Sequence, residues 1–433
     1  MSDKERSMGY IVFLSFVAAI GGILFGYDTA VISGTTEIVK AQFGLSTGLE
    51  GWFVGCALIG SIIGVTVAGM LSDFLGRKKT MLIAALMFSV SAVGCAVCGS
   101  FSQLVVYRMI GGFGIGVVSI VSPIYISEVA PAEKRGTLVS LYQLFITIGF
   151  LLAYLMNYII LRGASTDAAG AELGVRMFNQ EYWRGMFGCE AIPDLLFLVL
   201  IFFIPESPRW LAIRGQRQDK SEEWKALREP GILKAVLVGS AIAILGQFMG
   251  VNAVLYYGPK IFQDAGLSGE GSMFSTVLVG VVNMLTTVIA LLIIDKVGRK
   301  QLVWWGVGGM IVCLLCIGTW FAVGTMPTWF LLTFFLLYVF CTAISISAVV
   351  FVLLSEMYPN RVRGLAMSIA GLALWVGTYL IGQLTPWMLE NLTPAGTFFL
   401  FAFCCLPYLF IMWKYIPETT GKTLEEIEAY WKK

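Results

Sequence analysis

The sequence contains no histidine and little charge. Among its 433 residues there is no His, and Asp, Glu, Lys and Arg together make up 13% of the chain, about half the fraction in an average soluble domain. Without an imidazole, the chain can build neither a histidine metal site nor a histidine proton relay, so any proton chemistry must use carboxylates. The composition is 58% hydrophobic with a mean hydropathy of +0.83, which is typical of a protein that crosses a membrane several times.

Several motifs of soluble enzymes and pumps are also missing. No G-x-x-x-x-G-K-[S/T] phosphate-binding loop occurs, so the sequence does not encode an ATP-driven pump. The nine cysteines lie almost wholly in apolar runs, and the two C-x-x-C pairs, Cys95/Cys98 and Cys313/Cys316, lack the further ligands of a metal site. The glycine-rich residues 111–116 have no preceding strand, which predicts close helix packing. We therefore expect no metal, no cofactor and no enzymatic activity.

Apolar runs of roughly 20 residues, each long enough to cross about 30 Å of hydrocarbon, dominate the chain. They predict an all-α membrane protein with twelve transmembrane helices. No small-residue cleavage site accompanies the first run, so we expect that run to be retained as a span. The runs cover residues 10–33, 51–71, 80–99, 104–126, 138–161, 185–204, 232–257, 273–294, 302–323, 329–354, 365–389 and 397–416.

The distribution of Lys and Arg predicts the orientation of these spans. With both termini in the cytoplasm, 23 of the 29 basic residues fall on the cytoplasmic side, 5 fall in outer loops, and Arg108 alone lies within a span. Eleven or thirteen spans would place basic loops on both sides. We therefore expect a multi-pass protein of the inner (plasma) membrane with both termini in the cytoplasm.

Three charged motifs recur in the same order in the two halves of the chain, at offsets of 222, 228 and 212 residues. Duplication of a six-helix unit predicts two parallel bundles with a binding site between them, as in alternating-access carriers. We expect bundles at 1–204 and 232–416, a short cytoplasmic linker at 205–231 with room for one or two small helices, and a cytoplasmic tail at 417–433. The recurring motifs are Asp73-x-x-Gly-Arg-Lys and Asp295-x-x-Gly-Arg-Lys, Ser127-Glu-x-x-Pro and Ser355-Glu-x-x-Pro, and Pro205-Glu-Ser and Pro417-Glu-Thr.

Together these motifs resemble those of the sugar porter family of the major facilitator superfamily, and most closely its xylose–proton symporters and glucose transporters. The resemblance covers nearly the whole chain. It implies the major facilitator fold and the proton-coupled symport of a monosaccharide, pentose or hexose, or a related polyol. The motifs that carry it, besides the repeated Asp-x-x-Gly-Arg-Lys, are Pro205-Glu-Ser-Pro-Arg-Trp210, Gln247-x-x-Gly-Val-Asn252-x-x-x-Tyr256-Tyr257 and Pro417-Glu-Thr-x-Gly-Lys-Thr423.

One carboxylate, Asp28, falls within the first span, where a charge is costly unless it is paired or takes up a proton. It lies about five residues before the outer end of that predicted span, and Arg108 lies about five residues after the outer start of the fourth, so both are expected at similar depth. The arginine favours the ionised carboxylate and burial favours the neutral one. A pairing that changes with conformation would couple proton binding to transport, and a static buried ion pair is the alternative.

The family resemblance implies a coupling role for these residues. Asp28 and Arg108 match the proposed coupling pair of proton-driven members, and Glu190 in the sixth span matches a carboxylate suggested to assist them. Asp194, one helical turn after Glu190, stands where the family usually has a small residue. We assign it no role.

A neutral, hydroxyl-rich ligand needs amides and an aromatic face, and the spans supply both. Amides within a membrane either face a wet cavity or join helices. The resemblance implies that four of them contact the sugar, that Trp375 stacks on its ring, and that Tyr256 closes the outer mouth. The amides are Gln143, Gln247, Asn252 and Asn283.

Other positions depart from the pattern of the xylose carriers. Phe150 and Leu374 stand in place of glutamines, and Gly246 replaces the first of a glutamine pair. Phe351 replaces a tryptophan, and residues 345–348 replace a Gly-Pro segment. Each lost amide removes hydrogen bonds of about 1 kcal/mol net. The expected site is therefore less polar and differently shaped.

The repeated charged motifs place acids and bases at helix ends on the cytoplasmic side. We expect Asp73 and Asp295 to pair with arginines, Glu128 with Arg135, and Glu356 with Arg363. In the family resemblance such clusters latch the outward-open state, and simple anchoring of the helix ends is the alternative. The predicted gating residues are Asp73, Arg77, Glu128, Arg135, Asp295, Arg299, Glu356 and Arg363.

Two other functions remain open for a chain of this pattern. A facilitative uniporter would need no proton pair, so Asp28 and Arg108 argue against it. A transporter-like sugar sensor would carry a long cytoplasmic extension, whereas the tail that begins at Pro417 has about 17 residues. We expect a monomer in membrane lipid, with a sugar or polyol and a proton as partners and no nucleic acid.

Overall fold

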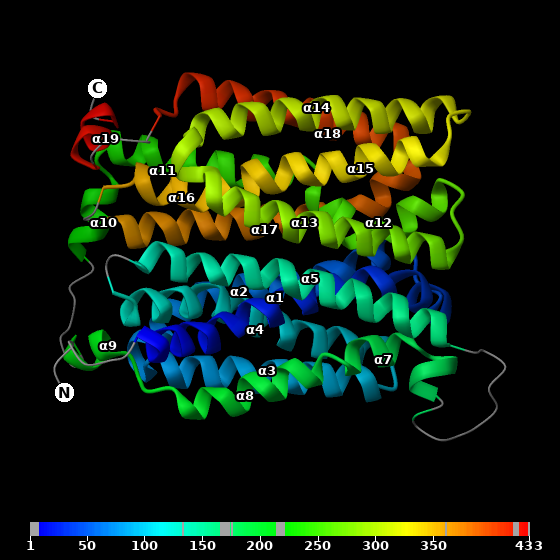
Figure 1. The fold of residues 1–433 in the computed structure, drawn as a ribbon, viewed down its shortest axis with the longest axis horizontal. Coiled ribbons are helices and arrows are strands. Elements are labelled where there is room, and N and C mark those ends of the chain that lie inside the picture. The colour runs from blue at the N-terminus through cyan, green and yellow to red at the C-terminus, as the bar shows by residue number, and fades with distance from the viewer. Residues whose placement is uncertain are drawn as a thin grey trace. The chain divides into compact units, whose positions relative to one another are not determined.

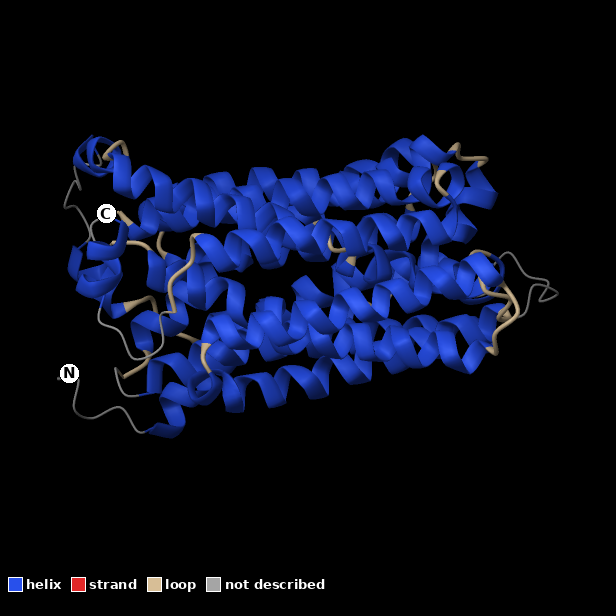
Figure 2. Cartoon of the chain, turned by 90° about the horizontal axis from the view of Figure 1, so that it is seen from above, coloured by secondary structure: helices blue, strands red, loops and turns tan. Residues whose placement is uncertain are grey.

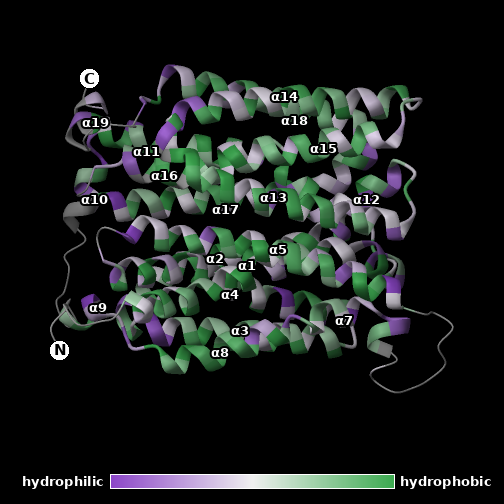
Figure 3. Ribbon diagram, viewed as in Figure 1, coloured by the Kyte–Doolittle hydropathy of each residue, from purple (hydrophilic) through white to green (hydrophobic). Residues whose placement is uncertain are grey.

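The computed structural model describes residues 8–131, 134–164, 174, 176–213, 221–359, 362–418 and 424–431. Within these ranges the chain is helical, and the predicted twelve membrane spans are confirmed: twelve helices are long and apolar enough to cross a membrane. Figure 2 shows helices joined by loops, and in Figure 3 hydrophobic residues cover most of the long helices while hydrophilic ones gather toward their ends.

The first six spans begin with five uninterrupted helices (Figure 1), and the sixth span is built from two shorter ones. Pro193 has no amide hydrogen for the helix ladder, and the two pieces of the sixth span meet at Cys189 and Glu190, shortly before it. The helices are α1 (Met8–Phe43), α2 (Thr47–Leu75), α3 (Arg77–Val97), α4 (Phe101–Val129) and α5 (Arg135–Gly163), followed by α7 (Trp183–Gly188) and α8 (Ala191–Phe203).

The last six spans contain two interruptions. The seventh breaks at Gly250, whose φ of 91° suits glycine, and the tenth contains a π-helical turn, η3 (Ala343–Ser347). The other helices are α11 (Pro230–Gln247), α12 (Val251–Asp264), α13 (Gly269–Val297), α14 (Arg299–Val323), α15 (Thr328–Thr342), α16 (Ala348–Met357), α17 (Arg363–Asn391) and α18 (Thr393–Lys414).

Short elements lie between and after the spans. A π-helical segment, η2 (Arg176–Gln180), precedes α7, and α19 (Leu424–Trp431) follows the last span. Two short helices, α9 (Pro208–Ile213) and α10 (Ser221–Leu227), occupy the linker, as its length predicts. The predicted tail is described only in part, because residues 419–423 and 432–433 lie outside the described ranges.

The chain divides into two compact units. Unit 1 comprises Met1–Gln216, Tyr256–Gln263 and Leu267–Gly280, and unit 2 comprises Arg217–Leu255, Asp264–Gly266 and Val281–Lys433. The division after residue 216 falls within the expected linker. The end of α12 and the start of α13 group with unit 1, which the sequence does not indicate. The predicted domain boundaries themselves stay predictions.

Glycines allow helices of unit 1 to cross at backbone distance. A Cβ atom at Gly112 on α4 would overlap the carbonyl oxygen of Ala57 on α2, and one at Gly149 on α5 would overlap that of Ile23 on α1. Close approach of this kind replaces the hydrophobic driving force that is absent between helices in lipid. The glycine-rich residues 111–116 therefore serve helix packing, as predicted.

The helix ends differ from the sequence prediction, most of all in the first span. Helix α1 continues to Phe43, ten residues beyond the predicted end of its apolar run. Within the added turns, Thr36 satisfies its hydroxyl by donating to the Ile32 carbonyl of the same helix, at 2.8 Å. Apolar length marks only the part that fits the hydrocarbon, and a helix can extend past that part into water.

Candidate functional site

Asp28 and Arg108 form a buried ion pair in unit 1. Asp28 on α1 and Arg108 on α4 are 1% and 2% exposed, and Arg108 Nη1 donates to Asp28 Oδ1. The same nitrogen donates to the Asp28 backbone carbonyl at 3.2 Å, and the guanidinium carbon lies 5.3 Å from the centre of the Phe187 ring. The structure thus brings together the two residues of the predicted coupling pair.

The depth estimate behind that prediction used the wrong helix end, because α1 runs 15 residues past Asp28. The pairing has a local cause. Gly111, less than one turn beyond Arg108 on α4, lies against Asp28, so that a Cβ there would be 3.2 Å from Asp28 Oδ2. Glycine therefore leaves the space that the carboxyl group occupies.

Glu190 and Asp194 bring two further acids to this region. They are 2% and 0% exposed, and the Asp194 amide donates to the Glu190 carbonyl at 3.2 Å, so one continuous helical turn separates them. Within the described residues, Glu190 Oε1, Asp28 Oδ2 and both carboxyl oxygens of Asp194 have no hydrogen-bond partner. Three buried carboxyl groups thus lie in this part of unit 1, and Arg108 donates its hydrogen bonds to one of them, Asp28.

Arg77 organises a second charged cluster in unit 1, at the junction of α2 and α3. Its Nε and Nη2 atoms donate to the two carboxylate oxygens of Glu128, both at 3.0 Å, and Nη1 reaches Asp73 at 3.2 Å. Glu206 accepts hydrogen bonds from the backbone amides of Arg77 and Lys78, which open α3. A carboxylate at a helix N-terminus satisfies amides that have no partner inside the helix.

The same arrangement recurs in unit 2. Arg299 donates to Glu356 at 3.1 Å, and Glu418 accepts from the amides of Arg299 and Lys300 that open α14. The glycines before the two helices, Gly76 and Gly298, share a φ of 98°. The structure does not describe the side chains of Asp295 and Ser355.

The expected pairing of the gating acids is wrong in detail. Glu128 binds Arg77 where Arg135 was expected, and Arg135 is exposed at the start of α5. Glu356 binds Arg299, while Arg363 donates to the Tyr358 carbonyl at 3.2 Å. The cause is the tight turn at Gly76 and at Gly298. In each turn the next residue is an arginine, whose side chain folds back over the end of the preceding helix and reaches the acid.

Gln247 and Asn252 meet where the seventh span breaks. Asn252 Nδ2 donates to Gln247 Oε1 at 2.6 Å, and Thr378 on α17 donates to the same oxygen at 3.1 Å. Gly377 leaves room for the Gln247 side chain, whose Cβ lies 3.2 Å from the position of an added Cβ. The break at Gly250 thus turns two amides toward each other and toward α17.

The other predicted substrate residues divide between the units. In unit 2, Trp375 on α17 is 7% exposed, and Asn283 on α13 is half-buried. In unit 1, Gln143 on α5 is half-buried and Tyr256 on α12 is 2% exposed. Phe150, which stands in place of a glutamine of the xylose carriers, is buried beside Tyr154, with ring centres 6.2 Å apart. The structure does not describe the side chain of Phe351.

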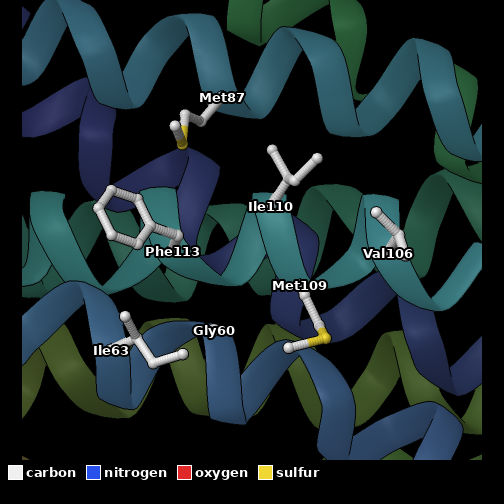
Figure 4. A pocket seen from close by; sticks show the side chains of 7 residues that line it. All are labelled: Gly60, Ile63, Met87, Val106, Met109, Ile110 and Phe113. Atoms are coloured by element: carbon white, nitrogen blue, oxygen red, sulfur yellow. The ribbon is translucent and has the colours of Figure 1, made fainter.

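A hollow of about 330 Å³ opens between α2, α3 and α4. Figure 4 shows apolar side chains around it, among them Ile63, Met87 and Phe113. Ile63 and Val106 are about half exposed on the outside of the unit. A sugar needs hydrogen-bonding groups that these residues do not have, so this hollow is suited to lipid chains and not to the expected substrate.

Sequence reasoning missed a charged cluster at the opposite helix ends of unit 1. Glu50, which opens α2 and is fully buried, accepts from Lys40 at 2.6 Å and from Lys260 at 2.7 Å. Lys260 on α12 also reaches Glu37, at 3.4 Å. The available signal was opposite charge at the ends of three spans that are expected on the outer side. It does not reveal which charges meet across 210 residues of chain.

Comparisons with known proteins agree with this architecture. The family model described as "Sugar (and other) transporter" matches residues 14–230 and again residues 216–431. The D-xylose-proton symporter of Escherichia coli is 37% identical over 488 residues, which cover 99% of this chain and 97% of that protein. The arabinose-proton symporter of Bacillus subtilis is 36% identical over 459 residues, with the same two coverages.

A solved structure gives the same result for the fold. The inward-open conformation of the xylose transporter XylE from E. coli matches with a TM-score of 0.83 and 37% identity, over 98% of this chain and all of that one. The family model matches each half of the sequence, and the relatives and the solved fold match nearly its whole length. The chain therefore belongs to the sugar transporter family and has the twelve-helix fold of the major facilitator superfamily.

Proposed function

We propose that this protein is a proton-coupled symporter that carries a monosaccharide, pentose or hexose, or a related polyol across the inner membrane by alternating access. The observation that carries the proposal is the buried Asp28–Arg108 pair in a duplicated twelve-helix carrier. Relatives that carry the names of xylose-proton and arabinose-proton symporters support it. The protein then acts as a carrier and not as an enzyme, as a monomer in lipid.

Coupling follows from the two charge states of Asp28. When the carboxyl is ionised it neutralises Arg108, and the pair holds α1 against α4. When the carboxyl takes up a proton, the attraction is lost and the two helices are free to rearrange. A proton and a sugar that both favour the same conformation then drive each other across the membrane, because each shifts the same equilibrium.

The substrate residues have the chemistry that a neutral sugar requires. Gln247, Asn252 and Asn283 donate and accept hydrogen bonds, and Trp375 offers a flat apolar face. Gln143 and Tyr256 serve the same ligand from unit 1, with Tyr256 at its outer mouth. Phe150 and Leu374 contribute no amide. This site therefore binds fewer sugar hydroxyls than a site with glutamines at these two positions.

The charged clusters serve as gates in this proposal. Both termini lie in the cytoplasm, so that the Arg77 and Arg299 clusters lie at the inner face and the Glu50 cluster lies at the outer face. A network that forms in one conformation and breaks in the other biases the equilibrium between them, although single exposed ion pairs are weak. Asp73, Asp295, Arg135 and Arg363 complete the inner gates.

Uptake by the purified protein in liposomes tests the function directly. Labelled pentoses, hexoses and polyols are offered with and without an imposed pH gradient, with the membrane potential clamped. Symport predicts that at least one of them accumulates above its outside concentration only when the gradient is present. Equilibration that never exceeds the outside concentration would identify a facilitative uniporter, and binding without uptake would identify a sensor.

A further inference from the structure

Asp194 is the buried acid to which the proposed coupling assigns no role. It lies in the first turn of α8 and is 0% exposed. Neither carboxyl oxygen has a hydrogen-bond partner within the described residues. Buried polar groups in proteins are nearly always hydrogen-bonded, so an orphaned carboxyl calls for an explanation.

The groups around Asp194 do not compensate a charge there. Helix α8 packs against α1 and α3. On α1, Asp28 and Tyr27 lie within electrostatic range of Asp194, and Cys95 on α3 lies within range of Asp28 and Glu190. Within the described residues, the hydrogen bonds that Arg108 donates go to Asp28. An uncompensated carboxylate in such a place is costly, whereas a carboxyl that carries a proton has no charge to compensate.

The three acids lie in one cluster, in which Asp194 interacts with Asp28 as well as with Glu190. Asp28 lies beside Arg108, and Glu190 interacts with both of them and with Asp194. Asp194 lies one helical turn further along the sixth span, toward its end at Phe203. Residues four apart on a helix share a face. The cluster therefore extends from the ion pair toward the end of the span that is expected at the cytoplasmic face.

We propose that Asp194 is a proton-relay residue, through which the coupled proton passes between Asp28 and the cytoplasmic face. The proposal rests on proton symport as proposed above. When Asp28 gives up its proton and pairs with Arg108, the proton moves by way of Glu190 to the carboxylate of Asp194. Asp194 releases it to water when the inner side of the bundle opens. One proton enters and one leaves, so the number of protons per sugar is set by Asp28 alone.

Three assays on the full chain in liposomes test the relay: the initial rate of uptake driven by a pH gradient, sugar counterflow at equal pH, and the final accumulation ratio. Asp194→Asn is expected to lower the driven rate by roughly tenfold or more, the size of effect expected when a positioned proton-transfer group is removed. Counterflow, which moves no net proton, stays close to that of the unsubstituted protein. The final accumulation ratio is unchanged, and Asp194→Glu restores the driven rate.

Several results would overturn the relay. An unchanged driven rate in Asp194→Asn would place the residue off the proton path, and an equal fall of counterflow would mark a structural role. A lower accumulation ratio would show that Asp194 carries a further coupled proton. If the unsubstituted protein shows counterflow but no gradient-driven accumulation, the proposal of proton symport fails. That outcome concerns the unsubstituted protein alone, so it is distinguished from a failure of the relay, which is read from the variant.

Infrared spectroscopy gives a readout that does not depend on transport. Difference spectra of the unsubstituted protein between two pH values are expected to contain the carbonyl band of a protonated buried carboxyl. Asp194→Asn should lose that band, and Asp194→Ser serves in its place if the asparagine variant fails to fold. A spectrum identical in the folded variant and the unsubstituted protein would contradict the proposal.

Discussion

Arg108 is held from several directions at the scale of single residues. It donates to the carboxyl and the backbone carbonyl of Asp28, and its guanidinium lies near the Phe187 ring. Its Nε has no partner within the described residues. A buried pair of this kind contributes little net stability, since desolvation of both charges offsets their attraction, but the loss of one partner is costly.

The pair therefore predicts a stability pattern. Arg108→Gln leaves Asp28 buried without its partner and is expected to lower the free energy of unfolding by about 3–5 kcal/mol at neutral pH. The double variant Asp28→Asn/Arg108→Gln, which removes both charges of the pair, should recover most of that loss. Unfolding of the detergent-solubilised proteins measures both. Equal losses in the single and double variants would contradict the pairing.

The helix ends carry the repeated chemistry at the scale of elements. In each half, an acid that follows the last span of the bundle, Glu206 or Glu418, accepts from the first amides of the third helix. An arginine at that same turn, Arg77 or Arg299, holds an acid at the end of the fourth helix. In each half, one set of charges thus joins the segment after the last span, the start of the third helix and the end of the fourth helix.

Charge reversal at Glu356 tests whether this set of contacts acts as a gate. Glu356→Lys places a cation beside Arg299 and should shift the balance between the inward- and outward-facing states, because the ion pair becomes a repulsion. Labelling of single cysteines on the two sides of the carrier measures that balance. Glu229→Lys, an exposed change just before α11, is the control. If Glu356→Lys is labelled in the same way as the control, the cluster does not act as a gate and only anchors the helix ends.

The cluster around Glu50 makes a prediction of its own. Glu50→Gln removes the buried charge that Lys40 and Lys260 share and is expected to cost about 3 kcal/mol of unfolding free energy. Glu270→Gln is the matched control, since its bridge to Arg162 is 3.6 Å long and exposed and such pairs contribute about 0–1 kcal/mol. Denaturant unfolding compares the two. A loss in Glu50→Gln no larger than in the control would contradict this role of Glu50.

At the scale of the whole molecule, the sequence pattern and the structure agree where the physics is local or repeated. Apolar length is enough to find twelve spans, because each must cross the same hydrocarbon thickness. A carboxylate and an arginine inside apolar runs are rare enough to predict a pair, and Asp28 and Arg108 do meet.

The remaining features depend on information that a single sequence does not contain. Glu128 selects Arg77 over Arg135 through the geometry of a tight turn, and Lys260 meets Glu50 only after distant helices have packed. The hydrogen bond between Asn252 and Gln247 depends on where the seventh span breaks. Partner choice among long side chains is a tertiary property, which helix periodicity does not specify.

Proton coupling through Asp28 is tested most directly by sugar accumulation in liposomes that contain Asp28→Asn. The unsubstituted protein is expected to concentrate its sugar when a pH gradient is imposed. The variant is expected to exchange labelled for unlabelled sugar in counterflow, which shows that it folds and binds, but to accumulate none above the outside concentration. Gradient-driven accumulation that survives in Asp28→Asn would contradict the role of Asp28 as the proton-binding residue.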